Sequence, residues 1–263
     1  MKKLVFILLV LGISTAGISQ IIKTEIPDRL VVLTFDDATA SQYAFVAPLL
    51  KQYGFGGTFF ICEFPPNFSD TTRYMNWRQI RELDRMGFEI ANHTKNHPIL
   101  PMLTIDEVED QLSYIDEKCD SMDIPEPVTF AYPGYALNST IVEYLRKRGY
   151  VFARIGGDRP YDPLVDYPLL VPSWAMTEKN REQIMNAFTE AKDGKIVVLT
   201  IHGVPDVEHP WVTTPPELFR EYLEFLHEND YRVISLRDLT RYVNTEEALR
   251  SISPDIPQSP QRY

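Results

Sequence analysis

Two adjacent carboxylates, Asp36 and Asp37, directly follow the apolar run Leu30–Phe35, which has the composition of a buried strand. Two anions at the end of a buried strand cost free energy, so the pair indicates chemistry rather than a turn. Two imidazoles four residues apart, His93 and His97, follow a second short apolar run. Together these side chains offer one carboxylate and two imidazoles as ligands for a divalent metal, and a second carboxylate as a general base.

Four segments follow one another in an order typical of a known family: Thr34–Ala38, His93–His97, Thr129–Pro133 and Val197–His202. Over about residues 28–240, the chain resembles the polysaccharide deacetylases of carbohydrate esterase family 4, also called the NodB-homology domain. The family's Thr-Phe-Asp-Asp-Gly corresponds to the first segment, and its His-(Ser/Thr)-x-x-His corresponds to the second. The resemblance implies a hydrolase that removes acetyl groups from N- or O-acetylated carbohydrate, such as peptidoglycan or a chitin-like or xylan-like polymer.

Hydrolysis of an acetyl amide or ester needs a nucleophilic water, a polarised carbonyl, a base and an acid. A divalent metal lowers the pKa of its water toward about 7 and also polarises the carbonyl. Asp37, His93 and His97 make a three-ligand site with open positions, which leaves Asp36 as the base. His202, at the end of another apolar run, is the expected acid for the leaving group, and the resemblance implies the same roles. These ligand types predict one zinc ion, with cobalt and nickel as alternatives.

The third motif departs from the family pattern. Family members commonly have an arginine here that holds the base carboxylate, whereas this chain has Ala131. Arg154 ends the next strand-like run, and we expect its guanidinium to take over that role. Tyr132 and Gly134 are expected at the substrate, because the main-chain N–H after Pro133 is placed to act as an oxyanion donor.

The fourth motif, which in the family supplies an Asp, is harder to locate. Three acids are candidates for orienting His202, although a solvated loop acid is the favoured interpretation of each one taken singly: Asp158, Asp162 and Asp166. Trp174 and Trp211 have aromatic faces that suit sugar rings, and an equally weighted alternative is that each covers the barrel core. His209 is ambiguous, and His227 is typical of a surface or hydrogen-bonded core residue.

Apolar strand-like runs alternate with amphipathic helix-like segments, which is the pattern of a parallel sheet. The predicted strands are 30–35, 58–62, 88–92, 128–131, 150–154, 169–171, 196–202 and 232–234. This order predicts an α/β fold, a distorted (β/α) barrel with seven or eight parallel strands, whose chemistry collects at the carboxyl ends of the strands. A capping box at Thr104–Glu107 predicts one helix start, another helix is expected from Asn138 to Gly149, and Ser235 is expected to cap a last helix, Leu236–Val243.

The 263-residue length fits one barrel domain over residues 20–249. Residues 1–19 indicate a secretory signal, with Lys2 and Lys3 before an apolar stretch that is too short for a comfortable membrane span. Residues 250–263 lack periodicity, which predicts a flexible tail. We therefore expect a secreted or periplasmic protein with no membrane insertion after signal cleavage.

The formal net charge is −11 at pH 7. This charge disfavours nucleic acid and anionic membrane surfaces as partners. The family resemblance implies acetylated carbohydrate as the partner. The cysteines Cys62 and Cys119 are predicted to be separate buried thiols, because the first ends a strand-like run and the second lies in a helix-like segment.

Two other functions fit the same sequence. A catalytically silent carbohydrate-binding protein of this fold is slightly favoured by the missing arginine, but disfavoured by the intact metal ligands, Asp36 and His202. A metal-independent hydrolase of small cyclic amides is disfavoured by the complete ligand set. Activity on acetylated oligosaccharides, measured with and without a chelator, separates the three functions.

Overall fold

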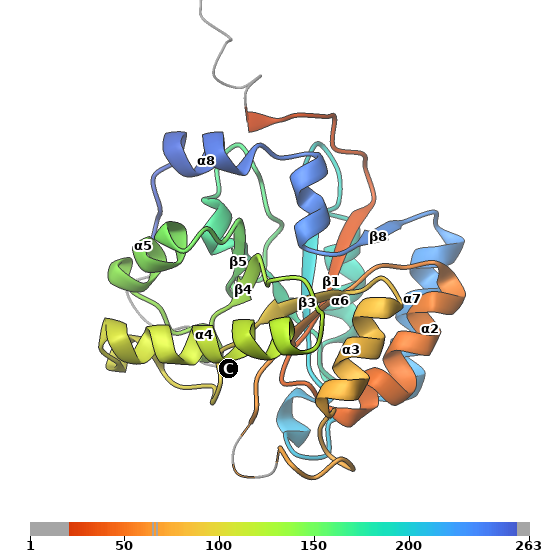
Figure 1. Ribbon diagram of the computed structural model, residues 1–263. Coiled ribbons are helices and arrows are strands. Elements are labelled where there is room, and N and C mark those ends of the chain that lie inside the picture. The colour runs from red at the N-terminus through yellow and green to blue at the C-terminus, as the bar shows by residue number, and fades with distance from the viewer. Residues whose placement is uncertain (1–20, 65, 67, 257–263) are drawn as a thin grey trace, which may run out of the picture.

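A single curled sheet of parallel strands forms an incomplete barrel, with helices packed around its outside (Figure 1). This computed structural model describes residues 21–64, 66 and 68–256, so the predicted signal segment lies outside the described residues. The strand order is β5-β4-β3-β2-β1-β7-β6, and β8 pairs with the first half of β1. The predicted α/β barrel with seven or eight parallel strands is confirmed.

The strands are β1 (Leu30–Phe35), β2 (Thr58–Ile61), β3 (Glu89–Asn92), β4 (Thr129–Ala131), β5 (Phe152–Arg154), β6 (Trp174–Ala175), β7 (Val197–Ile201) and β8 (Arg232–Ile234). The α-helices are α2 (Ala47–Tyr53), α3 (Trp77–Arg85), α4 (Ile105–Ser121), α5 (Ser139–Lys147), α6 (Arg181–Phe188), α7 (Pro216–Glu228) and α8 (Thr245–Ser251). Short π- or 3₁₀-helical turns are η1 (Gln42–Val46), η2 (Leu100–Met102), η3 (Pro133–Tyr135), η4 (Pro168–Leu170), η5 (Pro210–Val212) and η6 (Arg237–Arg241).

The predicted helix starts are confirmed at two places. Thr104 forms the expected capping box at the start of α4, and the Asn138 side chain accepts from the backbone of Ile141 at the start of α5. Gly149 follows α5 with a φ of 89°, a conformation that glycine adopts without strain. Both cysteines are buried and free, as predicted.

The strand predicted at 169–171 is wrong. Pro168 has no N–H to donate and begins the turn η4, so only Val171 pairs, as an isolated bridge with Arg154. The strand at this place in the sheet is instead β6, where Trp174 pairs with Leu199.

The last predicted helix, Leu236–Val243, is also wrong, because only the short turn η6 forms and Ser235 does not cap it. The first N–H groups of that segment are already bound: Leu236 donates to the Thr58 hydroxyl and Arg237 donates to the Glu89 carboxylate. The chain continues into α8, and Ile252 and Ile256 beyond it pack against buried apolar residues. Residues 257–263 of the predicted tail lie outside the described part of the chain.

Alternation along each strand divides the buried side chains into two groups. In β1, Val31, Leu33 and Phe35 belong to the core between the sheet and its helices, whereas Leu30 and Val32 belong to a separate core inside the barrel. Inward positions of neighbouring strands form an apolar middle layer: Val32, Phe60, Ala91, Ala131, Phe152 and Val198.

A polar cluster lies at the amino ends of β2, β3 and β4. The fully buried Glu89 carboxylate accepts from the Thr58 and Thr129 hydroxyls, each at 2.7 Å, and from the Arg237 backbone N–H at 2.9 Å. Burial raises the pKa of Glu89. This carboxylate therefore links three strands to the segment that follows β8.

We predict that Glu89→Ala destabilises the protein by on the order of 3 kcal/mol, because it leaves two hydroxyls and one N–H without an acceptor. Urea unfolding measures the change. As a control, replacing the exposed Glu224 on α7 with Ala should change stability by no more than about 0.5 kcal/mol. Equal, small effects of both substitutions would contradict the proposed role of the cluster.

Candidate active site and metal centre

The barrel mouth carries polar side chains at the carboxyl ends of the strands. The inward alternation of β1, β3, β5 and β7 continues past the apolar middle layer to Asp36, His93, Arg154 and His202. A cavity of about 170 Å³ opens here. Its lining residues are Asp36, Asp37, Phe64, His93, His97, Tyr132, Gly134, His202, His209, Trp211 and Val212. Every residue predicted as a base, acid or metal ligand is therefore at one cavity.

Asp37, His93 and His97 form a compact cluster whose ligand atoms lie within 4.8 Å of one another. Oδ1 of Asp37 is 3.5 Å from Nε2 of His93 and 3.8 Å from Nε2 of His97. Nδ1 of His93 donates to the Ala131 carbonyl at 2.7 Å, which leaves Nε2 as the lone-pair nitrogen facing the cluster. This donor set fits a divalent metal ion.

The charge states of the imidazoles agree with ligand chemistry. Burial lowers the pKa of His93 to about 3 and that of His97 to about 4, so both rings are neutral at neutral pH. A neutral ring is the form that binds a metal. Burial also raises the pKa of Asp37 to about 6, against the opposing effect of His202.

The loops that carry the ligands adopt left-handed backbone conformations. Asp37, Ala38 and His97 have φ values of 69°, 52° and 53°. Each costs about 1–2 kcal/mol for a residue with a Cβ, and such strain concentrates at functional sites. Ala38 stands where the family motif has Gly, and its carbonyl accepts from the backbone N–H of Met75 at 2.7 Å. Contacts around the loop therefore hold a conformation that the residue itself disfavours.

Asp36 lies beside the guanidinium of Arg154, as expected from the sequence. The Arg154 side chain is fully buried and donates to Oδ2 of Asp36 and to the Thr200 hydroxyl. Burial opposes ionisation of Asp36, but the positive charge of Arg154 and the hydrogen bond from its guanidinium lower the pKa of this carboxyl. Asp36 is therefore held as a carboxylate, and within the described residues its Oδ1 has no hydrogen-bond partner.

The register between β4 and β5 explains how Arg154 reaches Asp36. Ala131 and Arg154 are direct partners across these strands, so their side chains lie at the same level of the barrel. The methyl group of Ala131 leaves space there, and the guanidinium lies 5.5 Å from the Phe60 ring and 5.4 Å from the Tyr135 ring. Such faces favour a cation. The arginine is thus one strand away from its usual place in the family motif, at the same height.

Gln42 connects the ends of β1 and β7, a role that its sequence did not predict. Its buried amide donates to the backbone carbonyls of Asp36 and His202. Nε2 of His202 is 3.8 Å from Oδ2 of Asp37, whereas His93 and His97 lie near Oδ1 of the same carboxylate. An isolated Gln after an acidic motif has no pattern that marks it as a link between strands.

The loop after β7 is organised by Asp206, which sequence reasoning also missed. Its buried carboxylate accepts from the backbone N–H groups of Gly203 at 3.1 Å and His209 at 2.8 Å. It lies 3.6 Å from Nδ1 of His209, and this interaction raises the pKa of that imidazole. The His209 ring lies between Phe64 and Trp211, with ring centroids 4.8 and 5.4 Å away. His209, ambiguous in sequence, is thereby part of the cavity wall.

Of the other residues predicted to contact the substrate, some line the cavity and one does not. Tyr132 and Gly134 line the cavity, although the Tyr132 hydroxyl is turned to the Leu169 carbonyl at 3.1 Å. Trp211 lines it too and is 63% exposed. The sugar contact predicted for Trp174 is wrong, because its ring is buried in the core between the sheet and its helices.

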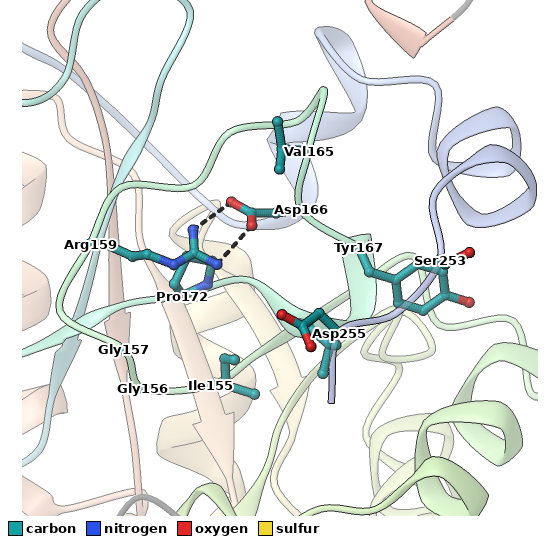
Figure 2. A pocket seen from close by; sticks show the side chains of 11 residues that line it. Ile155, Gly156, Gly157, Arg159, Val165, Asp166, Tyr167, Pro172, Ser253 and Asp255 are labelled. Atoms are coloured by element: carbon teal, nitrogen blue, oxygen red, sulfur yellow. Dashed lines mark hydrogen bonds and ion pairs between the residues drawn. The ribbon is translucent and has the colours of Figure 1, made fainter. Parts of the chain in front are cut away.

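None of the three loop acids lines the active-site cavity. Asp166 instead pairs with Arg159 through two hydrogen bonds of 2.7 and 2.8 Å (Figure 2). Tyr161, just before Asp162, pairs with Ile196 at the opposite end of β7 from His202. The expectation that Asp158, Asp162 or Asp166 orients His202 is therefore wrong.

A separate cavity of about 480 Å³ lies between this loop and the C-terminal segment. Figure 2 shows the side chains that line it. Its Arg159 guanidinium is already neutralised by Asp166, and Asp255 faces it from the opposite wall. No group of metal-ligating side chains lies there in the described part of the chain. The smaller cavity, at the barrel mouth, is the one lined by a group of side chains that could hold a metal ion.

Comparison with known proteins agrees with the geometry. The family model described as Polysaccharide deacetylase matches residues 23–153. The chain belongs to the polysaccharide deacetylase family. This is a family of hydrolases that act on the C–N bonds of acetylated sugars.

Two curated relatives and one solved structure are similar to this family member. A peptidoglycan-N-acetylglucosamine deacetylase of Bacillus cereus is 26% identical over 223 residues, or 83% of this chain and 92% of the relative. The Bacillus subtilis protein YxkH is 25% identical over 123 residues, 47% of this chain, and the match spans only 43% of its length. The Xyl-CE4 domain of a xylanase from the hindgut metagenome of Trinervitermes trinervoides superposes with a TM-score of 0.57 at 18% identity, covering 89% of this chain and 96% of that domain. This last likeness shows the shared fold.

We predict that the purified protein retains about one divalent ion and that His93→Ala abolishes this retention, because the substitution removes one of the clustered donors. Elemental analysis after dialysis measures occupancy. His227→Ala, on the exposed side of α7, is the matched control and should keep the ion. Full occupancy in the His93 variant would show that the ligand assignment is wrong.

We also predict strong coupling between Arg154 and Asp36. Arg154→Ala should cost about 3–5 kcal/mol, because it leaves a buried carboxylate without its countercharge. The Arg154→Ala/Asp36→Asn double variant should be less destabilised than the sum of the single variants by about 1–3 kcal/mol, measured by denaturant unfolding. Additive effects would argue against the pairing. Arg146→Ala, at an exposed i,i+3 pair with Glu143, should have almost no effect.

Proposed function

We propose that this protein is a metal-dependent deacetylase of acetylated carbohydrate, with Asp37, His93 and His97 as metal ligands, Asp36 as base and His202 as acid. The observation that carries the proposal is the joint position of all five side chains at one cavity, with Asp36 ionised beside Arg154. The related Bacillus cereus protein, named as a peptidoglycan-N-acetylglucosamine deacetylase, supports an acetylated sugar as substrate.

Each residue has a defined task in this proposal. A divalent ion, once bound, supplies an acidified water and a positive charge beside the acetyl oxygen. Oδ1 of Asp36 is buried and has no protein partner among the described residues, so it is available to accept the proton of the attacking water. Arg154 holds the other oxygen of Asp36 and fixes the direction of the carboxylate. His202, near Oδ2 of Asp37, donates the proton that the departing amine or alcohol requires.

The shape of the cavity supports an acyl group bound inside and a sugar bound outside. A volume of about 170 Å³ is below the usual range for an entire bound ligand but accommodates an acetyl group. Beside it, Trp211 exposes 63% of its surface, an apolar face on which a sugar ring could stack. Gly134 lies on the cavity wall, where its main-chain N–H is our candidate oxyanion donor.

Zinc is our proposed ion, because two imidazoles and one carboxylate suit it, with cobalt and nickel as alternatives. The structure describes no helix long and apolar enough to cross a membrane between residues 21 and 256. We propose secretion or a periplasmic location on the basis of the N-terminal sequence.

Acetate release tests the function directly. The full chain would be incubated with chitin oligomers, peptidoglycan and acetylated xylan, with and without a chelator and after restoring zinc. We expect release that stops with chelation and returns with metal. Binding of these carbohydrates without release would favour the silent binding protein, and release that ignores the chelator would favour a metal-independent hydrolase.

We predict that replacing Asp36 lowers the rate of the reaction, whereas replacing Asp37 lowers the affinity for the metal. Asp36→Asn should keep the ion but lose on the order of 10²-fold or more in kcat, the scale of a general base. Asp37→Asn should first lose metal affinity. Metal titration and steady-state kinetics on the same preparations separate these effects, and a wild-type rate in Asp36→Asn at saturating metal would exclude Asp36 as the base.

A further inference from the structure

Cys62 is a buried thiol that the proposed reaction does not use. It directly follows β2 and continues the inward alternation of Phe60, which brings it to the barrel mouth. Its Sγ lies 3.6 Å from Oδ1 of Asp37, within hydrogen-bond distance for sulfur. Cys62 is fully buried and Asp37 is only 3% exposed, so water does not compete for this contact.

The thiol contacts the oxygen of Asp37 that faces the two histidines of the proposed metal site. Oδ1 of Asp37 faces Nε2 of both His93 and His97, whereas Oδ2 faces His202. Cys62 donates its S–H to the oxygen of Asp37 that faces the histidine pair. Without this donor, the carboxylate could rotate and exchange its two oxygens between the histidine pair and His202.

We propose that Cys62 is a positioning residue for the metal ligand Asp37, its S–H donating to Oδ1 so that this oxygen already faces His93 and His97 before an ion arrives. The inference rests on the metal site of the proposed function. Groups that hydrogen-bond to metal ligands set ligand orientation, and their loss typically lowers metal affinity by about 10–100-fold. A thiol suits this buried place because it donates a hydrogen bond at a small desolvation cost.

The test compares metal dissociation constants, measured by competition with a chromophoric chelator, for Zn²⁺ and Co²⁺. Cys62→Ala removes the donor and should weaken binding by about 10-fold or more. Cys62→Ser keeps a donor of similar size and should remain within about threefold of the wild type. Cys119→Ala, at the other buried thiol, which lies in α4, should leave both constants unchanged. Circular dichroism checks that each variant is folded.

Two results would overturn the inference while leaving the metal site in place. One is wild-type affinity in Cys62→Ala. The other is a near-ultraviolet thiolate-to-cobalt charge-transfer band in the wild type that disappears in Cys62→Ser, because the sulfur would then be a ligand and not a donor. A wild-type protein that binds neither ion would instead overturn the proposed function, and this inference with it.

Discussion

The buried ion pair of Arg154 and Asp36 is the interaction on which the barrel mouth depends. A carboxylate in this position is tolerated only because a guanidinium accompanies it, and the guanidinium in turn needs the Thr200 hydroxyl and two aromatic faces. Removing the guanidinium leaves the buried carboxylate without its countercharge. The pair also keeps Asp36 ionised at neutral pH, which is the state that a general base requires.

The rest of the interior follows from the alternation of side chains in a curled sheet. Each inward position of a strand contributes to one layer, with Glu89 and its hydroxyl partners at the amino ends, aliphatic and aromatic side chains in the middle, and the charged groups at the carboxyl ends. At the amino ends the Glu89 carboxylate is satisfied by specific partners, whereas at the carboxyl ends one oxygen of Asp36 is left without a partner among the described residues. The same strands therefore set the stability of the barrel and the geometry of its chemistry.

Much of this arrangement could be predicted from the sequence, because it depends on local pattern. Apolar runs followed by Asp, His or Arg identify strand ends, and parallel strands bring those ends to one edge, which is how Arg154 could be predicted to reach Asp36. Contacts made by single residues across long separations have no such pattern. Gln42 joins the backbone carbonyls of Asp36 and His202, and Asp206 binds N–H groups of its own loop, but no residue spacing marks either role. Trp174 lies in β6 and is buried in the core, whereas Trp211 lies in the turn η5 and is exposed, and no sequence pattern distinguishes the two. Similarly, Leu169–Val171 has the composition of a strand, but Pro168 and the geometry of the preceding loop allow only one paired residue.

The loop after β7 has a further consequence for how such a protein could diversify. Asp206 binds the backbone of Gly203, Glu208 and His209, its own N–H donates to the Thr213 hydroxyl, and Thr214 closes the loop onto the Gly203 carbonyl. Other contacts tie the loop to the rest of the barrel: the Val204 N–H donates to the Ser41 hydroxyl, and Glu208 pairs with Arg73. Mutation can exchange the side chains at its tip, such as Val207 and Trp211, while Asp206 and Thr213 preserve its shape. If Trp211 contacts the sugar as we propose, the side chains that select the substrate can change while the strand ends that carry the proposed metal ligands stay the same.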